Sequence, residues 1–94
     1  MAVFVVTWNL NKERQNYAKA RADFISQFDH IEHIADPGLE SVMFIEVNNS
    51  AQQISDYLRQ KMDNNDCLLV SRLNSGECAG WVNVNVVEWI NTRI

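Results

Sequence analysis

Glycine, proline and cysteine are all scarce in this sequence. Its 94 residues include three Gly, one Pro and two Cys. So few breaking residues exclude a collagen-like or low-complexity chain, and two cysteines cannot build a disulfide framework. We therefore expect regular secondary structure throughout and reduced thiols at Cys67 and Cys78.

Long apolar runs and clustered basic residues are also missing. No run approaches the roughly 20 residues that span a bilayer, and the apolar start Ala2–Val6 is too short and lacks the basic flank of a secretory signal. The net charge is −4, and the eight Lys and Arg residues are scattered, which disfavours non-specific binding to nucleic acid. We expect a cytoplasmic protein without membrane contact.

What the chain has is apolar material for a core. Hydrophobic residues make up 47%, including three Trp, four Phe and two Tyr. This predicts one folded domain over residues 1–94. A chain of this length buries only about 60–65% of its unfolded surface, so self-association would add to a modest core.

The first half of the chain predicts two strong strands and a helix between them. Ala2–Leu10 is nearly continuous in apolar and β-branched residues, which is typical of a central strand. Asn16 precedes a helix-period apolar stripe that runs to about Phe28. Ile31–Ala35 is a short edge strand, and the Asp-Pro-Gly turn after it forms a hairpin with a strand over Ser41–Val47.

The second half repeats the helix–strand pattern. Ser50 opens a capping box for a helix that runs to about Met62, and Cys67–Leu73 predicts a strand. The tail is open to two interpretations. Trp81–Val86 alternates like a strand, whereas a turn at Gly80 followed by a helix capped at Asn85 suits the same residues. We favour the turn and the helix.

This order of elements predicts an α+β, ferredoxin-like βαββαβ domain with a short C-terminal helix. The expected antiparallel sheet has four strands in the order 4-1-3-2, with both long helices on one face. The other face would carry Val3, Val5, Thr7 and Asn9. Because a surface this apolar needs cover from another subunit or from the terminal segment, we expect a homodimer.

The opening VFVVTWNL resembles the first strand of the CRISPR-associated adaptation subunit ("Cas two") proteins, the SinR-like proteins and the virulence-associated protein D group. Their strands typically end in Ser/Thr, an aromatic residue, Asp and an aliphatic residue, where this chain has Thr7-Trp8-Asn9-Leu10. The Ser41–Glu46 pattern and the step Met62–Val70 are also similar. The resemblance covers most of residues 2–73.

The resemblance implies a ferredoxin-like fold, a homodimer built through sheet faces and, in some members, metal-dependent nuclease activity. That activity is assigned to the Asp at the end of the first strand, and this chain has Asn9 there. A neutral amide is a poor ligand for a hard divalent cation, which prefers carboxylates. The departure argues against nuclease catalysis in this chain.

No complete catalytic or metal-binding motif is present. Asp29, His30, Glu32, His33 and Asp36 are local candidates for metal ligands, but a site needs three or four that converge, so we expect no metal. Asp63 and Asp66 are candidates for metal binding or acid–base work or, alternatively, for helix termination and loop solvation. The candidate binding or interface residues are Thr7, Trp8, Asn9, Asn11, Arg72 and Trp81.

Three functional hypotheses remain. The first is a non-catalytic homodimeric module that binds a macromolecule, either a protein or, with less support, nucleic acid. The second is a nuclease, the one case that would need Mg²⁺ or Mn²⁺ as a cofactor. The third is a small regulator or inhibitor that acts by protein contact.

Overall fold

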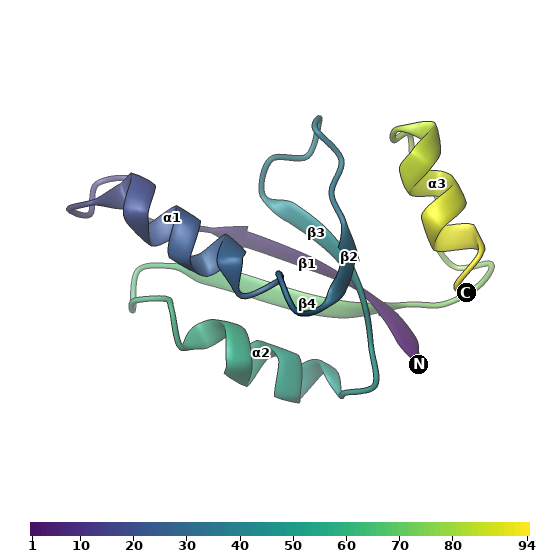
Figure 1. The fold of residues 1–94 in the computed structure, drawn as a ribbon, viewed down its shortest axis with the longest axis horizontal. Coiled ribbons are helices and arrows are strands. Elements are labelled where there is room, and N and C mark those ends of the chain that lie inside the picture. Colours follow the sequence, from purple (N-terminus) through teal and green to yellow (C-terminus); the bar gives the residue numbers. More distant parts are fainter.

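The structure is a computed structural model that describes residues 1–94, and it contains four strands and three helices. The sheet is antiparallel with the order β2-β3-β1-β4 (Figure 1). The predicted ferredoxin-like α+β fold and strand order are therefore confirmed. The elements in chain order are β1 (Ala2–Asn9), α1 (Tyr17–Ser26), β2 (Glu32–Ile34), β3 (Val42–Val47), α2 (Ala51–Arg59), β4 (Cys67–Leu73) and α3 (Val84–Asn91).

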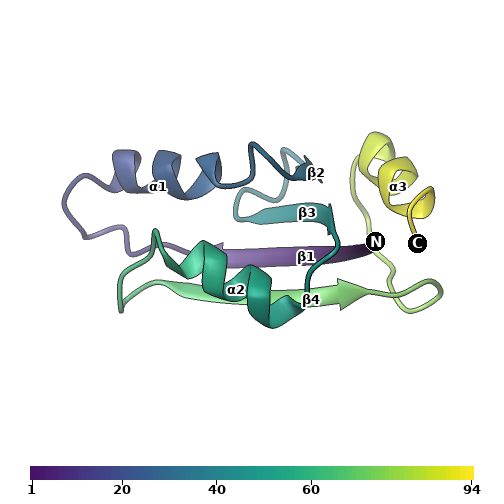
Figure 2. The ribbon, with the colours of Figure 1, turned by 60° about the horizontal axis from the view of Figure 1, so that its bottom comes forward.

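The main core lies between the sheet and the two long helices. Strand β1 directs alternate side chains toward α1 and α2, as its apolar alternation predicts. Trp8 of β1 packs there against Phe24 and Phe28, and the ring centroids of these three residues lie 5.0–5.9 Å apart. The buried cluster consists of Phe4, Val6, Trp8, Leu10, Phe24, Phe28, Met43, Ile45, Ile54 and Leu58. Figure 2 shows α1 and α2 alongside the strands, and α3 at the end where β1 begins.

Helix α1 begins where the sequence predicts, but not by the predicted cap. Asn16 adopts a left-handed conformation with φ 58° and makes no side-chain hydrogen bond to the helix. Asn tolerates this region better than most residues, so its role is to turn the backbone into the helix. The helix ends at Ser26, two residues before the predicted Phe28, which is nevertheless fully buried.

Helix α2 carries the predicted capping box. The Ser50 hydroxyl accepts the Gln53 N–H at 3.1 Å, and the Gln53 side chain accepts the Ser50 N–H at 2.9 Å. The helix ends at Arg59 rather than Met62. The next three N–H groups bond to carbonyls three residues earlier, which is the tightening that often closes a helix.

The β2–β3 hairpin forms around the Asp-Pro-Gly turn. One oxygen of Asp36, Oδ1, accepts the Gly38 N–H at 2.7 Å, and the Asp36 carbonyl accepts the Leu39 N–H at 2.9 Å. Each strand of the hairpin is shorter than predicted, since β2 covers only Glu32–Ile34 and β3 begins at Val42.

The tail contains the favoured helix, so the alternative strand over Trp81–Val86 is wrong. The predicted cap is also displaced, from Asn85 to Asn83, whose side chain accepts the Asn85 N–H at 2.9 Å. Both asparagines suit an N-cap chemically. Burial decides between them, because in the helix that begins at Val84 the side chain of Val86 is only 1% exposed.

Candidate binding surface on the open face of the sheet

The sheet has a second face, opposite α1 and α2, which we call the open face. Residues paired directly across antiparallel strands point to the same side. Val5, for example, pairs with Phe44 on β3 and with Ser71 on β4. The open face comprises Glu32, Ile34, Val42, Phe44, Glu46, Val3, Val5, Thr7, Asn9, Cys67, Leu69, Ser71 and Leu73.

Helix α3 covers one end of this face. Val3 and Phe44 are 1% and 7% exposed there, and Val86 of α3 is 1% exposed. The terminal segment is thus one of the two covers that the sequence predicts for this face. It is a partial cover, because α3 is only eight residues long.

The C-terminal end of α3 is held by a charged cluster. Arg93 Nε lies 3.3 Å from Glu46 Oε1, and its Nη2 lies 3.2 Å from Glu32 Oε1. The guanidinium also lies 4.2 Å from the ring centroid of Trp89, whose Nε1–H donates to Glu32 at 3.3 Å. One arginine therefore links α3 to both β2 and β3.

The N-terminal end of α3 is held by the hairpin turn. The Asn83 N–H donates to Asp36 Oδ2 at 2.6 Å, while Oδ1 of the same carboxylate is occupied by Gly38. Asp36 is 8% exposed, and both of its oxygens accept a backbone N–H. Asp36, one of the candidate metal ligands considered from the sequence, therefore joins the hairpin turn to the start of α3.

An apolar groove remains between α3 and the sheet. It encloses about 390 Å³. Its floor is sheet and its walls are α3 and the loop after β4. The lining residues are Val5, Phe44, Leu73, Cys78, Ala79, Gly80, Val82, Val87, Ile90 and Asn91.

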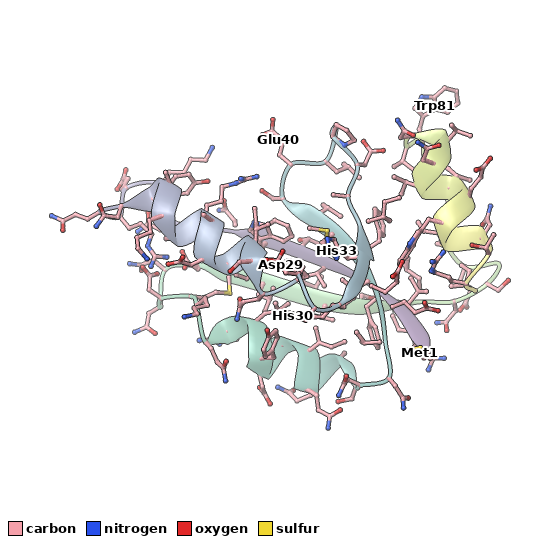
Figure 3. The ribbon with its side chains drawn as sticks, in the orientation of Figure 1. Met1, Asp29, His30, His33, Glu40 and Trp81 are labelled. Carbon is pink, nitrogen blue, oxygen red and sulfur yellow. The ribbon has the colours of Figure 1, made fainter.

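Beyond α3 the open face is uncovered along β1 and β4. Leu69, next to Thr7 in register, is 63% exposed. Trp81 and Val84, at the start of the terminal segment, are 101% and 65% exposed, and Figure 3 shows Trp81 projecting away from the body of the molecule. Exposed apolar side chains thus lie on both sides of the apolar groove.

Strand β4 also presents a free edge. It pairs only with β1 and is seven residues long, whereas the other edge strand, β2, has three. Natural edges are usually protected by proline, lysine or a short length. Strand β4 has none of these, and its one charged residue is Arg72.

The six binding residues predicted from the sequence do not converge on one site. Thr7 and Asn9 lie on the open face, and Trp81 lies in the loop before α3. Trp8 is in the core on the opposite face. Arg72 borders a polar hollow with Met1 and the start of α2.

Asn11 belongs to a buried polar cluster that closes the loops at the other end of the sheet. Its N–H donates to Asp66 Oδ1 at 2.7 Å, and Asp66 Oδ2 accepts from Arg14 Nη1 at 2.7 Å and from the Asp63 N–H at 2.9 Å. The Asp66 side chain is fully buried. Burial raises the pKa of Asp66, but these two N–H groups and Arg14 outweigh it, so that the pKa falls below its ordinary value.

The histidines and cysteines do not gather into a cluster. No three His, Cys, Asp or Glu side chains are grouped as a metal site requires. His33 Nδ1 lies 2.6 Å from the Ile31 carbonyl oxygen. Figure 3 labels His33 together with Asp29 and His30, which precede it in the sequence. Cys67 and Cys78 are both free and exposed.

Comparison with known proteins identified no relative of this chain. No family model, curated protein or solved structure matches this chain. None of the three helices is long and apolar enough to cross a membrane.

Sequence reasoning missed two parts of this surface. The position of Leu69 could have been predicted, because alternate residues of β4 point to one side of the sheet, and these include Leu69, Ser71 and Leu73. The link from Arg93 to Glu32 and Glu46 could not, because it joins residues 61 and 47 positions apart.

Proposed function

We propose that this protein is a non-catalytic, homodimeric binding module that uses the uncovered part of the open face. The observation that carries the proposal is the exposed apolar strip beside α3. The strip consists of Leu69, which is 63% exposed, and of the half-buried Val5 and Leu73, with the polar Thr7 and Ser71 between them. Exposed apolar side chains that gather on one face mark interaction sites in small proteins.

A second copy of the chain suits this strip. A two-fold interface brings the same patch of both subunits together, so an apolar strip meets an apolar strip. The free edge of β4 borders the strip, so a second copy would also protect that edge. A 94-residue chain has a modest core of its own and gains stability from such burial.

We propose a non-catalytic role because the acidic side chains already form hydrogen bonds and ion pairs within the chain. Both oxygens of Asp36 accept a backbone N–H, and the oxygens of Asp66 accept from two backbone N–H groups and from Arg14. Asp63 Oδ2 lies 3.5 Å from Arg14 Nε. Asn9, at the position where the resembling nucleases have Asp, carries no charge to attract a divalent cation.

Sedimentation equilibrium with matched variants tests the proposal. Leu69→Lys places a charge in the strip at an exposed position, where the fold tolerates it. Gln52→Lys adds the same charge on α2, far from the open face. We expect the wild type and Gln52→Lys to dimerise alike, and Leu69→Lys to weaken the dimer at least about tenfold. A wild type that stays monomeric at several hundred micromolar, or equal dimerisation of the two variants, would refute the proposal.

A further inference from the structure

A second hollow lies on the helix side of the molecule, between α1 and the β2–β3 connection. It encloses about 380 Å³, which is within the range of small-molecule sites. Its apolar lining includes Trp8, Ile25, Val42 and Met43. Arg21 of α1 and the turn after β2 form its rim. We call it the Trp8 groove, and it is separate from the apolar groove under α3.

Trp8, one of the residues that line this groove, carries an unused hydrogen-bond donor. The residue is only 6% exposed, because its ring packs against Phe24 and Phe28. Its Nε1–H makes no hydrogen bond within the chain, in contrast to the Nε1–H of Trp89, which donates to Glu32. The Nε1 atom of Trp8 is not fully buried, so solvent reaches it. Buried tryptophans usually have a partner for this group.

Arg21 brings a positive charge that no carboxylate neutralises. Its single contact is a long bond of 3.5 Å from Nη2 to the backbone carbonyl of Glu40. Arg14 and Arg93, by contrast, each lie within 4 Å of two acidic side chains. An exposed guanidinium beside an apolar floor is a ready partner for a planar anion.

The two acidic residues at the groove do not compete for Arg21. Both oxygens of Asp36 already accept backbone N–H groups. Glu40 accepts a hydrogen bond from Arg21 at its backbone carbonyl, while its side chain projects away from the molecule (Figure 3). Two hydrogen-bond donors are therefore available to a ligand in the groove, the Trp8 Nε1–H and the Arg21 guanidinium. The floor of the groove is apolar.

We propose that the Trp8 groove binds a small organic carboxylate with an apolar body. The carboxylate accepts from Arg21, an oxygen comes within reach of Trp8 Nε1–H, and the apolar body packs against Ile25 and Met43. This site does not depend on the dimer proposed above, because it lies on the other side of the sheet.

Nitrogen–proton correlation spectra test the site directly. The chain has three Trp, so its spectrum contains three indole signals, which single Trp→Phe variants assign. Phenylacetate, phenylacetamide and phenethylamine share one ring and carry a negative, a neutral and a positive group. We expect phenylacetate to shift the Trp8 signal saturably, and to bind about tenfold more tightly than the amide. The Trp81 signal should not move, because Trp81 lies in open solvent.

Charge variants on one helix supply the control. Arg21→Gln removes the proposed anchor, and the tenfold preference for the carboxylate should fall to about one. Lys19→Gln removes an equal charge from the same helix outside the groove, and should keep the preference. The proposal is overturned if phenylacetate leaves the Trp8 signal unmoved, if the three probes shift it equally, or if both variants behave alike. Loss of the wild-type dimer would not affect any of these readings.

Discussion

The buried cluster around Asp66 should be one of the most sensitive polar points in the molecule. In Asp66→Asn, the amide retains one oxygen, which can still accept the Asn11 N–H. The new NH₂ group replaces Oδ2, the acceptor of the bonds from Arg14 at 2.7 Å and from the Asp63 N–H at 2.9 Å. The Arg14 guanidinium and the Asp63 N–H, both of them donors, then face a third donor in a partly buried site.

The size of the effect follows from those two bonds. A hydrogen bond that involves a charged group contributes about 1.5–3 kcal/mol, and an orphaned buried partner costs a similar amount. We therefore expect the free energy of unfolding to fall by about 3–4 kcal/mol. A 94-residue chain has roughly 5–14 kcal/mol in total. With a urea m-value of about 1.2 kcal/mol/M, the midpoint should fall by about 2.5–3.3 M.

The same cluster predicts a dependence on pH with a defined sign. The folded-state pKa of Asp66 is lowered, because its hydrogen bonds and Arg14 outweigh the desolvation that opposes them. Its stabilisation is therefore complete above the unfolded pKa of about 3.9, and is lost as the pH falls through the lower folded value. The gap between wild type and Asp66→Asn should be largest near pH 7 and shrink below about pH 4.

Asp23→Asn provides the matched control. Asp23 also accepts from a basic partner at 2.7 Å, Lys19, and that bond lowers its pKa. It is an exposed pair on the surface of α1, where such interactions add little. Its urea midpoint should be indistinguishable from wild type. Equal midpoints for the two variants, or a gap for Asp66→Asn that persists unchanged at low pH, would refute the reasoning.

Two further predictions concern the helices. Ser50→Ala should lower the free energy of unfolding by about 1 kcal/mol in urea titrations, because the Gln53 N–H loses its acceptor; a change below about 0.3 kcal/mol would contradict the capping role. Arg93→Gln should speed hydrogen exchange of the α3 amides at least about fivefold while β1 stays protected, because it breaks the link to Glu32 and Glu46. Uniform exchange across both elements would show instead that the whole fold was weakened.

The architecture was accessible from the sequence because local signals and global packing agree. The alternation in β1, the capping box at Ser50 and the Asp-Pro-Gly turn each specify a unit, and handedness rules leave few ways to join them. The boundaries were less accessible. Whether α2 ends at Arg59 or Met62 is decided by where its last N–H groups find carbonyls, which no residue pattern encodes.

The binding surface was harder to predict because it depends on long-range contacts. The sequence indicates that the face carrying Val3 and Val5 needs cover, but not how much of it the terminal segment provides. That amount is set by Arg93 and Asp36, whose partners lie tens of residues away. Likewise, Trp8 is a core aromatic by its spacing, and only the packed structure shows that its ring nitrogen is left without a partner.

Helix α3 gives one sheet face two different evolutionary regimes. Val3 and Leu69 both point to that side, yet one is 1% and the other 63% exposed. A polar substitution at Val3 should be purged because it disrupts folding. The same change at Leu69 leaves the fold intact and alters only what the surface recognises, so this end of the sheet can diversify while the other stays fixed.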